Sequence, residues 1–166
     1  MIWGMSTATF TLFHVVISLI GIGSGLVVLW GFSRGKRLDG ITAIFLFTTV
    51  LTSVTGFAFP FDHLLPSHKV GIISLVALAL AIPARYALHL AGPWRWIYVV
   101  SAQIALYLNV FVLIAQLFEK VPTLKALAPK GTEPPFLVTQ LVVLLLFVVL
   151  TVFSVKKFHV GAPHAA

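Results

Sequence analysis

Residues 11–32 read TLFHVVISLIGIGSGLVVLWGF, and this stretch decides the fold class. It is apolar almost throughout, and about 20 such residues in a helix cross the hydrocarbon core of a bilayer, about 30 Å thick. Open strands would leave backbone groups without partners in lipid, and the alternating pattern of a membrane β-barrel is absent from the sequence. We therefore predict an all-α integral membrane protein, a bundle of five transmembrane helices with spans near residues 9–32, 40–59, 70–89, 94–118 and 136–155.

The composition supports a membrane protein. Hydrophobic residues make up 60% of the chain and charged residues 9%, and the mean hydropathy is +1.08, whereas about 25% of a soluble domain is charged. The net charge of +7 is spread in short clusters between the apolar runs, which indicates a lipid bilayer as partner and no nucleic acid. Residues 1–158 form one transmembrane domain, followed by a short tail at 159–166. Cysteine is absent, which excludes disulfides and thiolate ligands.

The basic residues predict the orientation in the membrane, because cytoplasmic connections are enriched in Lys and Arg. With five spans, seven bases and Asp39 fall on one side, and four bases with three acids on the other. The N-terminus is therefore predicted outside, and the C-terminus in the cytoplasm. The long connection at 119–136 is then outside, and its prolines forbid a continuous helix through it.

Small and hydroxyl residues on the first two spans predict close helix packing, with the partner helix in the same chain or in a second copy. Gly21 and Gly25 form a G-x-x-x-G pair, which lets a second helix approach closely. The stretch TTVLTSVTG in the second span supplies a matching face: Thr48, Thr52, Thr55 and Gly56. The alternative is a polar pathway lined by these threonines.

Polar residues inside the spans are the candidate functional residues, because such groups are costly in lipid. The predicted cluster near the outer face comprises His14, Asp62, His63, His68, Gln116 and Gln140. Gln103 and Asn109 lie deeper, in the fourth span. Arg85 and His89 are assigned to the inner surface, where the Arg stem can reach water. We expect His14 to face the bundle interior, within hydrogen-bonding reach of another member of the outer cluster.

Three interpretations of the outer cluster remain open. Its members satisfy one another's hydrogen bonds, or they line the mouth of a path for a proton or small solute. Alternatively, His14 with His63 or His68 binds a b-type haem or a transition metal through imidazole nitrogens. His14 and His89 fall on opposite sides of the membrane and are excluded as a haem pair. The sequence has no H-E-x-x-H, G-x-S-x-G or phosphate-binding glycine loop, and so no recognisable catalytic constellation.

Three stretches, FHVVISLIGIGSGLVVLWGF, YLNVFVLIAQLFEKVP and EPPFLVTQ, resemble small polytopic inner-membrane proteins of proteobacteria that have no assigned activity. The resemblance covers nearly the whole chain and implies a bacterial inner membrane. The leading hypothesis is a non-enzymatic protein without cofactor, acting as a subunit, an oligomeric scaffold or a small solute or proton pathway. Its partners are then a second copy or a larger membrane complex. The alternative hypothesis is the b-type haem or metal-binding redox protein.

Overall fold

The computed structural model describes residues 1–60 and 66–159, and over these residues the chain is all-α. The helices are α1 (Thr7–Ser33), α2 (Asp39–Gly56), α3 (Pro66–Tyr86), α4 (Trp94–Lys120), α5 (Pro122–Leu127) and α6 (Pro134–Lys157). All except the short α5 are long and apolar enough to cross a membrane. The prediction of an all-α chain with five helices long and apolar enough to cross a membrane is confirmed for the described residues.

Local chemistry explains where several helices begin and end. Ser6 caps α1, because its hydroxyl accepts a hydrogen bond from the backbone N–H of Thr9 at 3.1 Å. The helix α3 continues through Pro83 and ends at Tyr86, earlier than the predicted 89. His89 and Leu90 have φ angles of 47° and 59°, which lie in the left-handed region that an α-helix cannot use.

Prolines also set the helix starts in the connection at 119–136. Pro122 begins α5 and Pro134 begins α6, and a first-turn proline costs nothing because its missing N–H would have no helical partner. Glu133 precedes α6, and its carboxylate accepts hydrogen bonds from the backbone N–H groups of Lys130 and Thr132, both at 3.0 Å. Desolvation acts to raise the pKa of Glu133, but these N–H groups outweigh it and hold the pKa below its ordinary 4.5.

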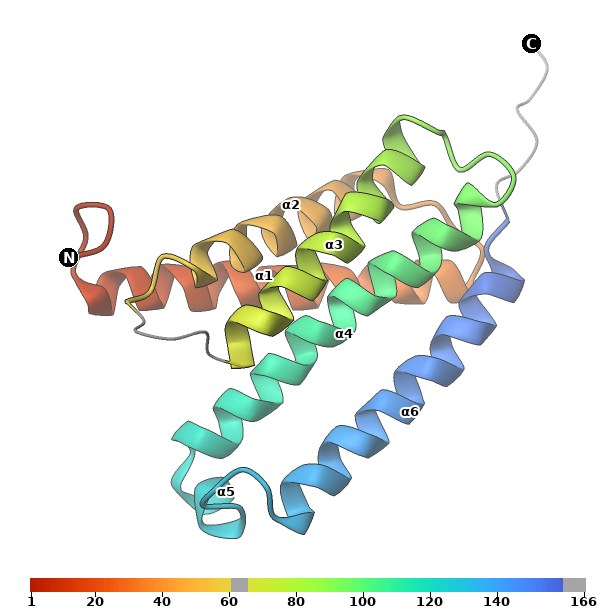
Figure 1. Ribbon diagram of the computed structural model, residues 1–166. Coiled ribbons are helices and arrows are strands. Elements are labelled where there is room, and N and C mark those ends of the chain that lie inside the picture. Colours follow the sequence, from red (N-terminus) through yellow and green to blue (C-terminus); the bar gives the residue numbers. More distant parts are fainter. Residues whose placement is uncertain (61–65, 160–166) are drawn as a thin grey trace.

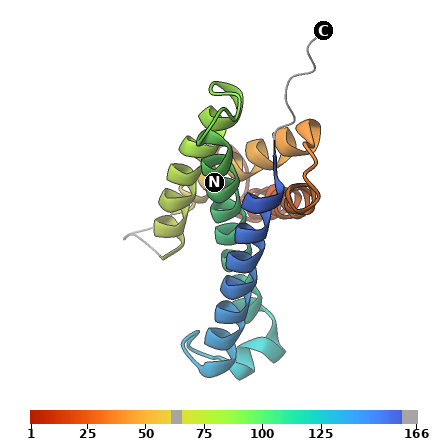
Figure 2. The same ribbon diagram turned by 90° about the vertical axis from the view of Figure 1, so that its right-hand side faces the viewer.

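The helices converge at one end of the bundle and diverge at the other (Figures 1 and 2). One end of the bundle is called the Arg85 end, and it carries the connections 34–38 and 87–93 and the last turn of α6. The opposite end, with the start of α1 and the end of α4, is called the His14 end. Toward the His14 end, α1 with α2 separates from α4 with α6 (Figure 1).

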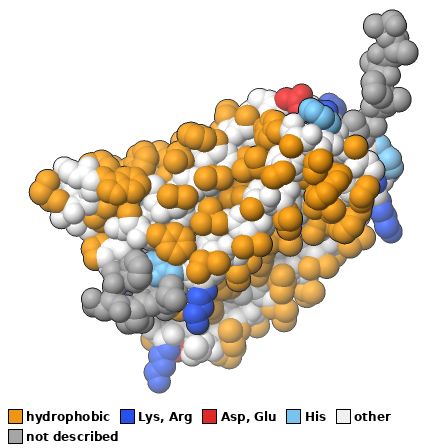
Figure 3. Space-filling model, turned by 45° about the horizontal axis from the view of Figure 1, so that its top comes forward, with side chains coloured by type: hydrophobic (Ala, Val, Ile, Leu, Met, Phe, Trp, Pro, Cys, Tyr) orange, Lys and Arg blue, Asp and Glu red, His pale blue; other side chains and the backbone are white. Residues whose placement is uncertain are grey.

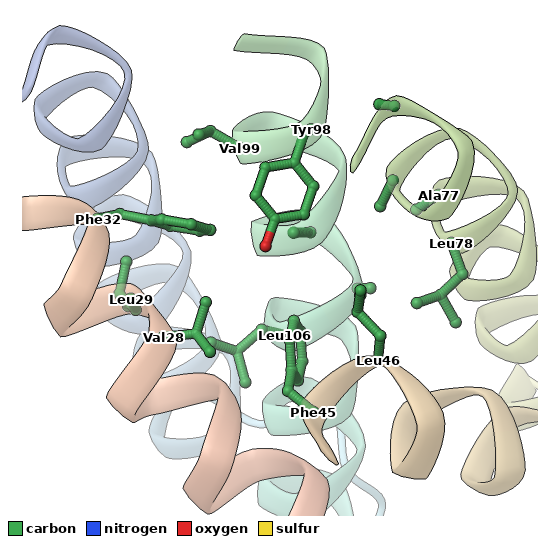
Figure 4. Packing of buried hydrophobic residues seen from close by; sticks show 14 of the residues in the cluster. Val28, Leu29, Phe32, Phe45, Leu46, Ala77, Leu78, Tyr98, Val99 and Leu106 are labelled. Atoms are coloured by element: carbon green, nitrogen blue, oxygen red, sulfur yellow. The ribbon is translucent and has the colours of Figure 1, made fainter. Parts of the chain in front are cut away.

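The apolar core lies mainly between the converging halves of the helices. Phe32, Tyr98, Phe45 and Leu106 come together there from α1, α2 and α4 (Figure 4). Ala77, Ala81 and Ala84 are all buried on α3, and these small side chains let α3 lie close to α4. The bundle is therefore packed solidly toward the Arg85 end.

The outward faces of the helices are apolar. In the view of Figure 3, hydrophobic side chains cover the length of the helices, and Lys and Arg gather toward the ends. Only 11% of the apolar window of α6 is buried inside the protein. Such a surface is stable in lipid but would be costly in water.

Arg85 is buried, and not extended to water as predicted. Its side chain is 2% exposed, and its Nη2 forms an ion pair with Asp39 at the start of α2. Nη1 donates to the Tyr98 hydroxyl at 3.2 Å. Arg95 in α4 donates to the carbonyls of Val155, at 3.0 Å, and Phe158. These bonds tie α2, α3, α4 and the end of α6 together, so the Arg85 end is closed by polar contacts as well as by the core.

Candidate functional site

The diverging helices enclose a pocket at the His14 end, with a volume of about 580 Å³. It is called the His14 pocket, and side chains of α1, α2, α3 and α4 line it. Of its lining residues, Thr11 and Phe59 lie nearest the His14 end of the bundle, called the mouth, and Ile22 and Asn109 lie nearest the Arg85 end, called the floor. Cavities of this size, mostly apolar with a few polar groups, are the usual form of a small-molecule site.

His14 lies on the wall of this pocket and is held in one orientation by α2. Its Nδ1 is 2.8 Å from the Oγ1 of Thr55, and its ring stands edge-on to Phe59 with centroids 5.3 Å apart. The Thr55 hydroxyl donates its only proton to the Leu51 carbonyl at 2.7 Å. Thr55 therefore accepts from His14, which places the imidazole proton on Nδ1. The remaining nitrogen, Nε2, is then a hydrogen-bond acceptor.

The floor of the pocket carries polar side chains from α2 and α4. Thr52 and Asn109 line it, and a Cβ built on Gly21 would lie 3.6 Å from the Nδ2 of Asn109. Within the described part of the chain, neither the Thr52 hydroxyl nor the Asn109 Nδ2 has a hydrogen-bond partner, although both atoms are buried. Each such group costs about 1–3 kcal/mol. Since both atoms have almost no accessible surface, they lie in the helix contacts around the floor and do not face the cavity.

The two glycines of the G-x-x-x-G pair lie where α1 meets α2 and α4. A Cβ on Gly21 would approach the hydroxyls of Thr48 and Thr49 to 3.2 and 3.3 Å, and a Cβ on Gly25 would come within 2.5 Å of Leu106 Cδ1. Gly56, on the partner face of α2, lies beside His14, since its Cβ would be 3.9 Å from the imidazole Cε1. The glycine stripe thus brings α2 close enough for Thr55 to reach His14.

Part of the predicted outer cluster gathers at the mouth of the pocket. His68 and Gln116 line it together with His14, and Glu119 and Lys120 follow at the end of α4. His68 is 3% exposed, and its ring stacks on Phe57 at 5.3 Å. A second hollow, of about 410 Å³, shares Gln116 and lies between α3 and α4.

Other predicted residues lie elsewhere. The Nε2 of Gln140 donates to the Phe111 carbonyl at 3.1 Å, on α4, and Gln140 does not line the pocket. Gln103 faces α6, where its Oε1 accepts from Thr151 at 2.9 Å. Asp62 and His63 lie outside the described residues. The hydrogen-bond partner found for His14 is Thr55, which was assigned to helix packing and not to the outer cluster.

Sequence reasoning missed two contributors to the pocket wall. Ser53 donates to Ser74 at 3.2 Å, which joins α2 to α3 beside the cavity. Serines are common in membrane helices, and nothing in their spacing indicates this pair. The spacing of seven placed Asn109 and Gln116 on one face of the fourth span, but Asn109 was not assigned to the outer cluster, although both residues line the pocket.

Among residues 1–60 and 66–159, no group of three or more His, Asp or Glu side chains could hold a metal ion. Comparison with protein-family models, with curated proteins and with solved structures finds no match for this chain. The function must therefore be argued from the site itself.

Proposed function

We propose that this protein is a non-enzymatic membrane protein that binds a small, largely apolar molecule in the His14 pocket. One observation carries the proposal: a mostly apolar pocket of about 580 Å³ has on its wall the His14 imidazole, whose Nδ1 is held by Thr55 so that Nε2 is left as an acceptor. A small apolar molecule with one hydroxyl group could fill the pocket and donate a hydrogen bond to Nε2. The packed core at the Arg85 end makes a pocket closed at its floor more plausible than a path through the bundle.

The proposal includes a location. We place the protein in a bacterial inner membrane, with the N-terminus outside and the C-terminus in the cytoplasm, from the excess of Lys and Arg on one side. The His14 pocket then opens toward the outer face. The exposed apolar face of α6 contacts lipid, and it is also the face on which we place contact with a second copy or a larger membrane complex.

Single cysteines test the pocket, because the chain contains no cysteine of its own. Ser74 and Leu78 are both buried, but Ser74, 3% exposed, lines the pocket, whereas Leu78, one turn along α3, is packed in the core. We expect N-ethylmaleimide, a small neutral imide, to label the variant Ser74→Cys in lipid nanodiscs and to spare Leu78→Cys. Both variants should be labelled after denaturation, which serves as the control for thiol reactivity.

A pocket-filling variant completes the test. Leu113 lines the cavity, so Leu113→Trp should occupy part of it and slow the labelling of Ser74→Cys. Leu145→Trp on the exposed face of α6 is the matched control, since Leu145 is 55% exposed, and it should leave the labelling unchanged. If Ser74→Cys reacts no faster than Leu78→Cys in the native protein, small molecules do not enter the pocket and the proposal is wrong.

A second candidate function is the binding of a b-type haem or a transition metal. The observation that favours it is the bond between His14 and Thr55, because metal-binding histidines usually donate their other ring N–H to an oxygen. His14 Nε2 would then be one ligand, with His68, across the same pocket, as the other. An absorption spectrum of the purified protein separates the two candidates: a Soret band that His14→Ala abolishes would establish haem.

A further inference from the structure

Basic side chains gather at the Arg85 end, opposite the His14 pocket. Seven Lys and Arg residues lie there, at positions 34, 36, 37, 85, 95, 156 and 157. Asp39 is the only acid that the described residues place at this end, and it already pairs with Arg37 and Arg85. Arg95 donates to backbone carbonyls near the end of α6. Four bases remain for which the described chain has no ion pair: Arg34, Lys36, Lys156 and Lys157.

Contacts between the ends of α1 and α6 bring three of these bases together. Arg34 and Lys36 both lie over the ring of Trp30, at 5.5 and 5.4 Å from its centroid. Gly35 lies between them in the sequence, and a Cβ built on it would approach the Lys157 carbonyl to 3.2 Å. All three basic side chains are exposed. We call Arg34, Lys36 and Lys157 the Arg34 cluster.

Buried aromatic rings fix the two helix ends against each other. The ring of Phe32, in the last turn of α1, meets the ring of Phe158, directly after α6, with centroids 4.9 Å apart. Both rings are buried, and the two helix ends lie side by side in Figures 1 and 2. The backbone positions of the Arg34 cluster are therefore held by the core.

The helices α1 and α6 are long enough to carry the Arg34 cluster to the level of the lipid headgroups. With 27 and 24 residues, they span about 40 and 36 Å, whereas the hydrocarbon core is about 30 Å thick. Each helix also ends with an aromatic ring and a cation four residues apart. Arg34 lies over Trp30, and the Nζ of Lys157 lies 5.8 Å from the centroid of Phe153. Exposed aromatic rings followed by cations are typical of the boundary between acyl chains and phosphates.

The structure thus gives the Arg34 cluster a ligand of definite chemistry, beyond the proposed function and at the opposite end of the bundle. We propose that the cluster binds the phosphate of an anionic phospholipid whose acyl chains lie along the apolar ends of α1 and α6. The headgroup supplies the counter-charge that the described chain lacks here. Arg34 can donate two parallel N–H bonds to phosphate oxygens, while Lys36 and Lys157 attract the phosphate as point charges. Basic sites between membrane helices are typical binding places of acidic headgroups.

The test uses the full chain in dodecyl maltoside micelles, with dioleoylphosphatidylglycerol as probe. Dioleoylphosphatidylcholine is the reference, because it has the same acyl chains but its ammonium offsets the phosphate charge. Native mass spectrometry counts the lipids that stay bound at each lipid concentration and gives an apparent dissociation constant. We expect the wild type to bind phosphatidylglycerol more tightly than phosphatidylcholine. The double variant Arg34→Gln with Lys36→Gln should weaken the binding of phosphatidylglycerol by about five-fold for each cation removed.

Two single variants separate the Arg34 cluster from the net charge of the protein. Lys125→Gln removes an exposed cation from α5, at the His14 end, and should keep the affinity of the wild type. Lys157→Gln changes α6 alone and should weaken the binding of phosphatidylglycerol by about five-fold. It keeps the inference testable if the double variant on α1 does not fold, which unfolding temperatures without lipid will show.

Four results would overturn the inference. The first is equal affinity of the wild type for the two lipids, and the second is unchanged affinity for phosphatidylglycerol in the cluster variants. The third is an equal loss of affinity in Lys125→Gln, which would mean that net charge alone attracts the lipid. The fourth is displacement of phosphatidylglycerol by inorganic phosphate but not by sodium chloride of equal ionic strength, which would indicate a site for free anions. None of these results depends on the His14 pocket, so the proposed function stands or falls separately.

Discussion

Gly25 tests how tightly α1 packs against its neighbours. A Cβ on Gly25 would lie 2.5 Å from Leu106 Cδ1 and 2.9 Å from two ring carbons of Phe45. Both neighbours are 1% exposed, so they have little room to move. Overpacking of this kind costs about 1–3 kcal/mol, while replacing glycine by alanine within a helix returns up to about 1 kcal/mol. We expect Gly25→Ala to lower the free energy of unfolding by about 1–2 kcal/mol.

Gly23 is the matched control on the same helix. Nothing lies within 4 Å of a Cβ built there, so Gly23→Ala has only the gain in helix propensity. It should raise the free energy of unfolding by about 0.5–1 kcal/mol. The two substitutions are chemically identical, and their difference of about 1.5–3 kcal/mol measures the helix contact alone.

The free energies can be measured by reversible unfolding in mixed micelles, with increasing sodium dodecyl sulfate and helicity as the signal. A double-mutant cycle adds a second check: in a Leu106→Ala background, the nearest clashing atom is gone and the penalty of Gly25→Ala should shrink. If Gly25→Ala is as stable as Gly23→Ala, α1 does not lie against Leu106 and Phe45 as described.

Three further predictions concern charged residues and topology. Asp39→Asn should lower the free energy of unfolding by about 3 kcal/mol, because it leaves the buried Arg85 without a counter-charge. Arg85→Met should lower the free energy of unfolding by less, because the Asp39 side chain is 69% exposed and water solvates the carboxylate that is left. Cysteines introduced at Ser33 and Thr132 should react with a membrane-impermeant maleimide from opposite sides of the membrane, and labelling from the same side would refute the proposed orientation. The pKa of Glu133 is lowered, so the stability that its carboxylate contributes is full above the ordinary 4.5 and is lost as the pH falls through the lowered value. The protection of the amides that it binds, which is their exchange rate relative to the intrinsic rate at the same pH, should then fall, and Glu133→Gln should show this low protection also above pH 4.5.

The fold class could be predicted because it depends on quantities that the sequence states directly. Length and hydropathy of the apolar runs are enough to identify membrane helices, and the five long helices follow these runs. The predicted positions of the helix ends were less accurate, because the residue at which a helix begins or ends depends on local backbone conformation. The second helix ends at Gly56 and not at 59, and the third begins at Pro66 and not at 70.

The site could be predicted only in part, because sequence gives the depth of a residue but not the direction in which its helix faces. Depth placed His14, Gln116 and Gln140 together, and His14 and Gln116 do line one pocket. Gln140 lies at a comparable depth, yet α6 packs on another side of α4, so its amide bonds to the Phe111 carbonyl. The rotation of a helix about its axis follows from packing, which a single sequence does not specify.

Arg85 shows that the surroundings of a charged side chain also depend on helix packing that a single sequence does not specify. Its contacts also explain why the two ends of the bundle differ. A lone Arg near a helix end is expected to reach for water, because burying it without a partner is costly. The close approach of α3 to α4 instead places the guanidinium against Tyr98, and α2 begins with Asp39 within reach of it. The Arg85 end thus supplies an internal counter-charge. Buried atoms without a partner in the described structure occur at both ends, among them Arg85 Nε and the Ser154 hydroxyl at one end and the Thr52 hydroxyl and Asn109 Nδ2 near the pocket floor. The two ends therefore differ in packing and not in unpaired buried groups: the core fills the Arg85 end, whereas the cavity at the His14 end leaves room for a ligand beside His14.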